Sequence, residues 1–542
     1  MKMLVLCLAT LGLLAGQAFA AGPPLEDVTL VPLGTYDTGV FDESAAEIVA
    51  YHAKSKRLFI TNAFDGAIDV VDIHDVTAPE LLFQIPTGGG GPTSVAVHPR
   101  RGLIAVAVMA DTKTDDGTVE FFSTNGEPLG SVGVGALPDM VVWTHDGRKV
   151  LVANEGEPSD DYLTDPEGSV SIITLGVGQP DKMVQQATVQ TAGFSDGIVG
   201  PGVRIYGPGA SAAQDLEPEY IAVSKDDKTA WVTCQENNAI AMLDVETAQF
   251  QWVRSLGYKD HSLAGNALDA SNKDDGINIA NWPVLGMYQP DAIATYRVGN
   301  DQYLITANEG DAREYVIEDP EDPEEEIDIF VEETRGKKLD LDPTVFPDAE
   351  TLQENENLGR LKVTTSYPAV EGEAGYAEIY SFGTRSFSIW TAEGDLVFDS
   401  GEQFAQITAA FTPELFNATN DEDDPDARSD DKGCEVESVT LGKINGRTIA
   451  FIGLERIGGV MIYDVSNPVS PTFCDYVNNR VDGEVGPDLG PEGLTFIPAG
   501  KSPIDEPLLV VANEVSGTTT IFVVIAPDDD DDDDDDDDED DD

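Results

Sequence analysis

Basic residues are scarce in this chain of 542 amino acids, where 31 Lys and Arg face 101 Asp and Glu and leave a net charge of −70. This balance excludes nucleic acid as a partner, because binding its phosphates requires clustered Lys and Arg side chains. Anionic membrane surfaces are disfavoured for the same reason. The charge favours cations as partners, although an acidic surface also keeps a protein soluble in salty water without any binding site.

Histidine and cysteine are also rare, with five and four residues. No His or Cys cluster has the spacing of a zinc site, and no Ser–His–Asp or Cys–His arrangement of a nucleophilic enzyme can be recognised. Cys7 lies in the predicted leader, which leaves Cys234, Cys434 and Cys474. A disulfide between Cys434 and Cys474 and three unpaired thiols are equally compatible with the sequence of an exported protein.

Long apolar runs are absent apart from residues 3–14, which follow Lys2 and precede Ala18-Phe19-Ala20. This pattern predicts a signal peptide over residues 1–20. A membrane-spanning helix requires about 20 apolar residues, so we expect a mature chain without a transmembrane segment that is secreted, periplasmic or held at the cell surface. Residues 528–542 are all acidic and are predicted to form a disordered poly-Asp tail.

A repeated unit accounts for most of the remaining sequence. In each copy a polar or acidic residue opens an apolar strand, and a second apolar strand follows a turn and ends in a polar cluster. Three copies align closely, at residues 137–156, 217–236 and 289–310, and four looser copies begin near residues 46, 92, 435 and 491. Seven such units of short strands predict an all-β fold, a seven-bladed β-propeller that occupies residues 21–527 as a single domain.

The ends of the repeat region suggest how the ring closes. Residues 28–36 form a lone strand before the first unit, and residues 519–525 form the last strand of the seventh. We expect the N-terminal strand to complete the last blade, because unpaired strand edges promote aggregation. Helical periodicity is confined to residues 404–415.

Loop insertions interrupt the ring at residues 180–215, 255–287 and 314–353. Insertions of this length are either functional lids or irregular excursions from the fold. The third insertion is acidic and broken by proline, and it is predicted to be a solvated loop.

Acidic residues recur at two fixed positions of the unit. The first two strands of a blade are antiparallel neighbours nearest the axis, so the start of the first and the end of the second lie at the same end of the sheet. The residues that open the units are Glu47, Asp139, Glu219, Asp291, Glu437 and Glu492. Those that close the second strands are Asn62, Glu155, Glu236, Glu309, Glu455 and Glu514. The second unit offers Thr93 and Met109 instead, and the rest are predicted to surround one mouth of the central channel.

Carboxylates gathered in this way either raise each other's pKa or require a cation. Oxygen ligands suit Ca²⁺ or Mg²⁺. We therefore predict a site for one of these cations, with ligands drawn from Glu155, Glu219, Asp291, Glu309, Glu437 and Glu492. For any single residue the simpler interpretation is a carboxylate that caps a turn or accepts a hydrogen bond from a neighbouring backbone amide.

Three of the few arginines lie in or beside the repeated motifs, namely Arg313, Arg385 and Arg456. Arginine next to bound cations is what a phosphate or carboxylate ligand requires. We predict that these side chains bind such a ligand, while an arginine that only neutralises a neighbouring Glu is equally compatible with the sequence.

Several motifs resemble the choice-of-anchor I family. They are Ala153-Asn-Glu-Gly-Glu-Pro, Asp215-Leu-Glu-Pro-Glu-Tyr, the segment 266–278, Gln289-Pro-Asp-Ala-Ile-Ala, Thr306-Ala-Asn-Glu-Gly-Asp-Ala-Arg and Gly490-Pro-Glu-Gly-Leu. The resemblance spans nearly the whole mature chain and implies an exported bacterial or archaeal propeller with a variable C-terminal anchor. Some members are described as alkaline-phosphatase-like or surface-glycoprotein-like. The present sequence departs from that pattern in having poly-Asp after Pro527.

Two hypotheses of function remain open at this point. The first is a metal-dependent phosphoesterase, similar to propeller phytases and calcium-dependent propeller alkaline phosphatases, in which the metals bind a phosphorylated small molecule and activate water. The second is a non-catalytic adhesion or ligand-binding module that Ca²⁺ stiffens and that recognises a cell-surface ligand. The hydrolase is our first expectation, with its catalytic residues unassigned. Dispersed arginines would favour the binding module.

Overall fold

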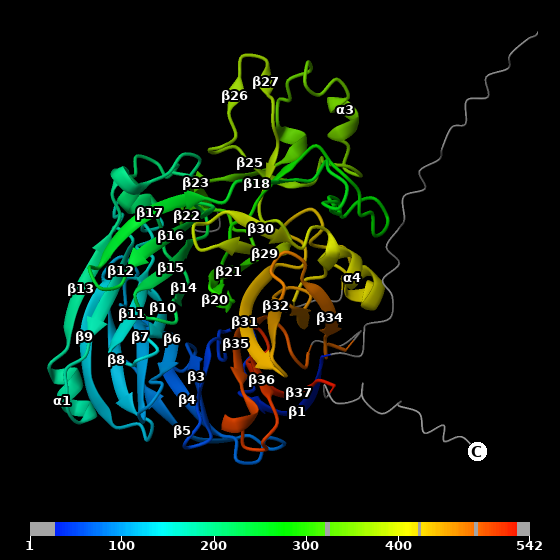
Figure 1. The fold of residues 1–542 in the computed structure, drawn as a ribbon. Helices are drawn as coiled ribbons and strands as arrows, with labels where there is room; N and C mark the ends of the chain where they lie inside the picture. The colour runs from blue at the N-terminus through cyan, green and yellow to red at the C-terminus, as the bar shows by residue number, and fades with distance from the viewer. Residues whose placement is uncertain (1–27, 320–325, 421–423, 482–485, 528–542) are drawn as a thin grey trace, which may run out of the picture.

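The computed structural model describes residues 28–319, 326–420, 424–481 and 486–527. The predicted signal peptide and the poly-Asp tail lie outside these residues. Among the described residues, strands dominate and form seven antiparallel sheets of four strands each, together with one mixed sheet of five short strands and two hairpins (Figure 1). No helix in the described part of the chain is long and apolar enough to cross a membrane.

The seven four-stranded sheets follow one another along the chain. The first three are β2 (Val49–His52), β3 (Arg57–Asn62), β4 (Ala67–Asp72) and β5 (Glu80–Pro86); β6 (Gly91–Val97), β7 (Leu103–Met109), β8 (Asp116–Ser123) and β9 (Pro128–Ala136); and β10 (Pro138–Trp143), β11 (Lys149–Asn154), β12 (Ser169–Thr174) and β13 (Thr188–Gly193). The next two are β14 (Ile221–Val223), β15 (Thr229–Cys234), β16 (Ala239–Asp244) and β17 (Gln249–Ser255); and β20 (Ile293–Val298), β21 (Asp301–Asn308), β29 (Ser386–Thr391) and β30 (Leu396–Asp399). The last two are β31 (Val436–Ile444), β32 (Arg447–Leu454), β33 (Val460–Asp464) and β34 (Thr472–Val477); and β35 (Pro491–Ile497), β36 (Leu508–Asn513), β37 (Thr518–Ile525) and β1 (Thr29–Asp37).

The first strand of each sheet contacts the first strands of the sheets before and after it. The contacts run from β2 through β6, β10, β14, β20, β31 and β35, and back to β2. Sheets arranged radially around their own first strands make a β-propeller. The strand nearest the N-terminus, β1, pairs with β37 in antiparallel register from Thr29 opposite Ile525 to Asp37 opposite Thr518.

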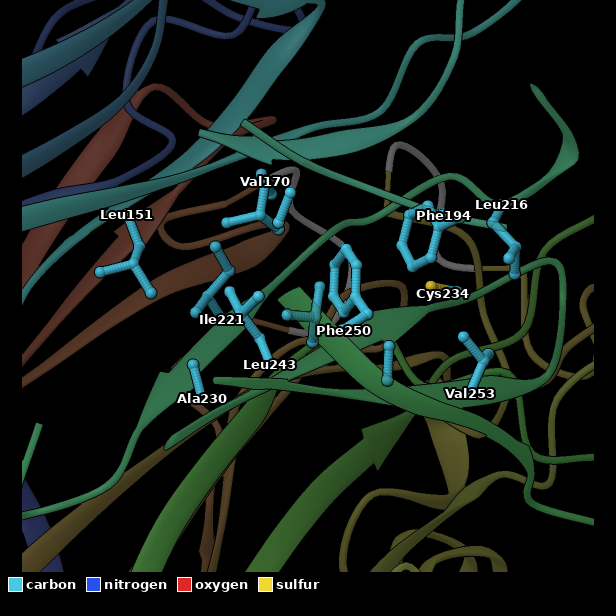
Figure 2. Close-up of a cluster of buried hydrophobic side chains, with 14 of the residues drawn as sticks. Leu151, Val170, Phe194, Leu216, Ile221, Ala230, Cys234, Leu243, Phe250 and Val253 are labelled. Atoms are coloured by element: carbon cyan, nitrogen blue, oxygen red, sulfur yellow. The ribbon is translucent and has the colours of Figure 1, made fainter. Parts of the chain in front are cut away.

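The core lies between neighbouring sheets. Figure 2 shows one such layer, in which Leu151 and Val170 of one sheet meet Ile221 and Phe250 of the next. Phe194 stacks on Phe250 with ring centroids 4.2 Å apart. Since the middle strands are covered on both faces, their sequences are continuous apolar runs rather than alternating ones.

The insertions form a separate layer on one side of the ring, visible above it in Figure 1. Its elements are the five-stranded sheet β18 (Tyr258–Asp260), β19 (Leu285–Met287), β28 (Tyr380–Ser381), β25 (Lys362–Thr364) and β24 (Glu333–Arg335); the hairpins β22 (Glu314–Glu318) with β23 (Glu326–Val331) and β26 (Glu371–Gly372) with β27 (Gly375–Tyr376); and helix α3 (Ala349–Leu352). A hydrophobic cluster of its own includes Leu268, Leu341, Phe346, Leu361 and Ile379.

Four local expectations can be compared with this fold. The solvated loop expected at 314–353 is wrong for most of that segment, because Leu339, Leu341 and Phe346 bury themselves between the acidic residues. Residues 188–193 belong to a sheet rather than to an insertion, and α1 (Pro180–Gln185) and α2 (Ala212–Asp215) flank them. The helical stretch is confirmed as α4 (Gln403–Phe411). Cys234, Cys434 and Cys474 are buried thiols, and no disulfide joins Cys434 to Cys474.

Candidate metal centre

The carboxylates of the repeat gather at one end of the innermost strands. Asp139, Glu437 and Glu492 lie at the second residue of β10, β31 and β35, and Glu219 and Asp291 lie just before β14 and β20. The inner strands β2, β6, β10 and β35, together with Tyr220, line a cavity of about 350 Å³ that includes Ile48, Val95, Met140 and Leu494. The acidic residues therefore gather at one end of the inner strands, here called the rim, as the antiparallel pairing of the first two strands requires.

A β-bulge aims several of these side chains. The pairing register shifts between Pro138 and Val141, between Val436 and Val439, and between Pro491 and Gly493, so each opening carboxylate lies inside a bulge. A bulge redirects a side chain out of the regular alternation of a strand. The backbone two residues earlier has positive φ at Leu137 and at Glu435. The conformation that points the carboxylate at the channel is thus built into the start of the first strand.

The first group of carboxylates consists of Asp139, Glu155 and Glu219, whose oxygens lie within 4.8 Å of one another. Within the described residues, none of the three forms an ion pair with Lys or Arg. Burial, followed by the charge of Glu157, raises the pKa of Asp139 to about 7. Burial and the neighbouring carboxylates also raise the pKa of Glu155 and of Glu219 well above its usual value. Ionising all three groups together therefore requires a cation.

Glu236 and Asp291 extend this group along the rim. Glu236 is 8% exposed, and its Oε2 is buried without a hydrogen-bond partner among the described residues. Burial raises the pKa of Glu236 to about 7, against the opposing charge of Arg313. The charge of Glu236 in turn raises the pKa of Glu155 and Glu219. Burial and then Glu309 raise the pKa of Asp291 well above the usual range. A buried oxygen without a partner is the kind of atom that a bound ion satisfies.

The second group consists of Glu309, Glu437 and Glu455, again with oxygens within 4.8 Å of one another. It differs from the first in having positive neighbours. Lys432 Nζ lies 3.1 Å from Glu309 Oε1, and Arg456 Nη1 lies 3.2 Å from Glu455 Oε1. Of the three, Glu437 alone has an oxygen, Oε2, that is buried and without a hydrogen-bond partner in the described part of the chain. The second group is therefore partly neutralised by the protein itself.

The other residues at these two positions of the repeat have separate surroundings. Burial, then Glu47 and Glu514, raise the pKa of Glu492 well above its usual value. Ser44 Oγ donates to Glu514 Oε1. Asn62 donates to Asp69 Oδ2 over 3.2 Å, so its amide orders a turn and a strand. Thr93, at the corresponding position of the second sheet, donates to the carbonyl oxygen of Pro138.

The three predicted arginines occupy different surroundings. Arg313 is buried, and its guanidinium donates to Asp215 Oδ1 over 2.6 Å and to Glu217 Oε2 over 3.1 Å. Arg385 donates to the backbone carbonyl oxygens of Asp269, Ser429 and Asp431. Arg456 is the one of the three that forms an ion pair with a carboxylate of the rim, Glu455, and 29% of its side chain is exposed. The donors of Arg313 and Arg385 are thus occupied by protein acceptors.

The sequence reasoning missed Lys432, Glu217 and Glu435. Lys432 reaches Glu309, Asp311 and Glu435. Burial opposes the ionisation of Glu435, but Lys432, Arg428 and Arg456 outweigh it and hold the pKa of Glu435 well below its usual value. The available signal was composition, since Lys432 and Arg428 are the two basic residues in the acidic stretch that leads into β31.

Comparison with known proteins identifies the family. A model of the choice-of-anchor I domain matches residues 47–468. The chain belongs to the choice-of-anchor I family. The match covers the first five four-stranded sheets and three strands of the sixth, and it ends before the last sheet. The resemblance inferred from the motifs is confirmed.

Two curated proteins are similar to this member of the choice-of-anchor I family. Gigasin-3a of Magallana gigas is 29% identical over 185 residues, which are 31% of this chain and 65% of that protein. The mesenchyme-specific cell surface glycoprotein of Strongylocentrotus purpuratus is 28% identical over 282 residues, which are 47% of this chain and 35% of that protein. The chain spans less than two thirds of the length of either relative.

Two solved structures align along most of the chain. Kuenenia stuttgartiensis hydrazine synthase has 12% sequence identity and a TM-score of 0.43, with 91% of this chain and 99% of that chain covered. The β-propeller domain of Myceliophteria thermophila Cps50 (Swd1) has 7% identity and a TM-score of 0.44, with coverages of 92% and 100%.

Proposed function

We propose that this chain is an exported, surface-associated propeller of seven blades, closed by β1, that binds Ca²⁺ at Asp139, Glu155 and Glu219. The observation that carries the proposal is three clustered carboxylates without an ion-pair partner in the described part of the chain. Buried, unpartnered Glu236 Oε2 supports it. Because the three ligands come from two neighbouring sheets, an ion there would hold the two blades together and stiffen the rim.

The hydrogen-bond partners of the arginines favour a binding module over a hydrolase. An anionic substrate would require free guanidinium donors beside the cation, whereas Arg313 and Arg385 are occupied by acceptors within the protein. One relative is named a cell surface glycoprotein, which supports a role in surface recognition for this chain too. We therefore propose a calcium-stiffened surface module that binds a ligand without transforming it.

Calcium is expected to raise the melting temperature of the EDTA-treated protein. A ligand that binds only the folded state at 100 times its Kd adds about 2.7 kcal/mol to the free energy of unfolding. Glu219→Gln removes one ligand charge and is expected to abolish most of this gain. Differential scanning fluorimetry over a Ca²⁺ titration measures it. Glu246→Gln is the matched control, because Glu246 is exposed at the far end of the same sheet. Equal Ca²⁺ responses in both variants would contradict the proposed site.

The second candidate function is a metal-dependent phosphoesterase. Two positive side chains beside the second carboxylate group favour it. Half-buried Arg456 pairs with Glu455, and Lys432 pairs with Glu309. A bound metal and a guanidinium together stabilise a transferring phosphoryl group. Hydrolysis of p-nitrophenyl phosphate and phytate, measured after EDTA and again with Ca²⁺, Mg²⁺ or Mn²⁺, tests it. Metal-restored turnover that Glu437→Gln abolishes and Glu246→Gln preserves would establish the hydrolase. No turnover with any metal would leave the binding module.

A further inference from the structure

The turns between the first and second strands of the seven four-stranded sheets lie at the end of the inner strands opposite the rim. With the residues that flank them, these turns occupy seven stretches, at 52–57, 98–102, 144–149, 224–229, 297–301, 443–447 and 498–507. The stretches hold thirteen of the 31 Lys and Arg residues of the chain but six Asp or Glu residues, so positive charge prevails here although the net charge of the chain is −70. This set of basic residues, the basic ring, consists of Lys54, Lys56, Arg57, Arg100, Arg101, Arg148, Lys149, Lys225, Lys228, Arg297, Lys443, Arg447 and Lys501.

Two pockets gather seven side chains of the basic ring. The first pocket has a volume of about 480 Å³ and the second about 370 Å³, and no Asp or Glu is among the described residues that line either of them. The cavity of about 350 Å³ adjoins both, because it shares Pro99 with the first pocket and His145 with the second. The basic lining residues are Lys54, Arg100, Arg101 and Lys501 in the first pocket and Lys225, Arg297 and Lys443 in the second.

The seven basic side chains of the pockets are exposed and have no carboxylate partner. In the part of the chain that the structure describes, ion pairs on this face join Arg148 to Asp146 and Arg447 to Asp464, and none includes a residue of the seven. Arg100 and Arg101 each donate a hydrogen bond to a backbone carbonyl oxygen, over 3.3 and 2.9 Å. Since a guanidinium has five N–H donors, most of these donors stay available to an anion.

The described chain ends on the same face. Asn445 Nδ2 donates over 2.9 Å to the carbonyl oxygen of Pro527, and Asn445 lies in the turn between β31 and β32, two residues after Lys443. Residues 528–542 follow, and all of them are acidic. A segment of this length extends at most roughly 50 Å. Seven inner strands about 10 Å apart enclose a ring roughly 20 Å across, so the acidic segment can reach both pockets.

We propose that the acidic segment 528–542 docks on the basic ring of its own chain and closes the two pockets to other anions. Its carboxylates supply the counter-charges that the seven side chains lack. The attachment at Pro527 gives the segment an effective concentration in the millimolar range, whereas the net charge of the chain repels a free polyanion. The rim lies at the other end of the inner strands, so docking leaves its carboxylates uncovered.

Acetylation of lysines in the full chain, with the rate at each residue read by mass spectrometry, tests this proposal. The parent chain is compared with a variant of equal length in which residues 528–542 are replaced by alternating Gly and Ser. We expect roughly fivefold slower acetylation in the parent chain, because its acidic segment covers the lysines at a high effective concentration. The lysines expected to show this protection are Lys54, Lys225, Lys443 and Lys501.

Exposed lysines of the insertion layer are the internal controls. Lys273, Lys337 and Lys338 are exposed far from the basic ring and are expected to react equally in both chains. The protection of the ring lysines is expected to disappear in about 1 M NaCl, where the screening length falls to about 3 Å. All rates are measured in EDTA, so the outcome does not depend on the Ca²⁺ site at the rim and either proposal can fail alone.

Charge removal in the parent chain locates the contact. Arg100→Gln with Arg101→Gln removes two charges from the first pocket and is expected to raise the acetylation rates of Lys54 and Lys501 at least twofold. Lys337→Gln with Lys338→Gln is the matched control, since it removes two adjacent exposed charges from the insertion layer. It is expected to leave those rates unchanged. Equal melting temperatures in EDTA show that each variant is folded.

Three results would overturn the proposal. The first is equal acetylation of the ring lysines in the parent chain and in the Gly/Ser variant. The second is protection of Lys273 and Lys337 to the same degree, which would reflect the overall charge of the acidic segment rather than docking. The third is protection that falls when the protein is diluted, which would mean that the segment docks on a second copy of the chain.

Discussion

Replacing Glu332 by Gln is expected to lower the free energy of unfolding by about 3–5 kcal/mol, because it leaves the Arg204 charge buried without its counter-ion. Arg204 and Glu332 pair with no exposure of either side chain. Arg204 also donates to the carbonyl oxygens of Tyr367 and Glu236 and stacks on Tyr206, with the guanidinium 4.0 Å from the ring centroid.

Glu332 is the acceptor that connects this cluster. Its carboxylate accepts hydrogen bonds from the hydroxyl groups of Tyr206 and Thr364, over 2.9 and 2.7 Å, and from the backbone amide of Arg313 over 3.3 Å. The cluster joins the insertion layer to the loop before β14, and the carbonyl of Glu236 brings it to the channel rim. Loss of the Glu332 charge therefore weakens a junction between two parts of the molecule.

Chemical denaturation of Glu332→Gln against Glu333→Gln measures this effect. Glu333 pairs with Lys362 over 2.9 Å in a partly exposed position, so its loss is expected to cost at most about 1 kcal/mol. The double variant Arg204→Met with Glu332→Leu removes both charges and is expected to be less destabilised than Glu332→Gln alone. Similar midpoints for Glu332→Gln and Glu333→Gln would show that the buried pair contributes little.

In the absence of divalent cations, stability is expected to fall as the pH rises from about 5 to about 7. Glu236 has a pKa of about 7 in the folded protein, raised from 4.5 first by burial. Between these two values the folded state keeps a proton that the unfolded state has lost. The contribution of Glu236 to the free energy of unfolding is thus complete below pH 4.5 and is lost as the pH rises to about 7. The loss amounts to at most about 1.4 kcal/mol per pH unit.

Calcium is expected to oppose this fall in stability with rising pH, because a cation binds the rim carboxylates only after they lose their protons. The melting temperature measured from about pH 5 to pH 8 should therefore fall in EDTA and fall less, or rise, in Ca²⁺. Glu236→Gln should flatten the profile in EDTA, and Glu246→Gln should leave it unchanged. A profile in EDTA that rises between pH 5 and 7 would mean that the rim carboxylates are already ionised and stabilised by the protein.

The gathering of the opening and closing carboxylates could be predicted from the sequence. Asp139 and Glu155 belong to antiparallel neighbours joined by a short turn, so their positions in the repeat imply that they meet. Which carboxylates form a close group could not be predicted in the same way. Glu219 joins Asp139 and Glu155 across a boundary between sheets, and that distance depends on how far each bulge turns its side chain.

The hydrogen-bond partners of the arginines could not be predicted from the sequence. Arg313 binds Asp215, which is 98 residues away, and Glu217, which is 96 residues away. Nothing in the local sequence distinguishes these acceptors from the many other Asp and Glu residues. In the same way, the acidic segment 314–353 reads as solvated by composition, although a few apolar residues spaced along it bury a core together with residues from 268 to 379.

The sequence by itself determined the all-β repeat architecture and the placing of acidic residues at one end of the units, because strand periodicity and antiparallel pairing act over only a few residues and recur in every copy. The tertiary structure decided which carboxylates meet without a counter-ion, which arginines are occupied, and where the insertions bury their own core. Those outcomes depend on contacts between residues tens to hundreds of positions apart, and the long-range packing of sheets, loops and charges sets them.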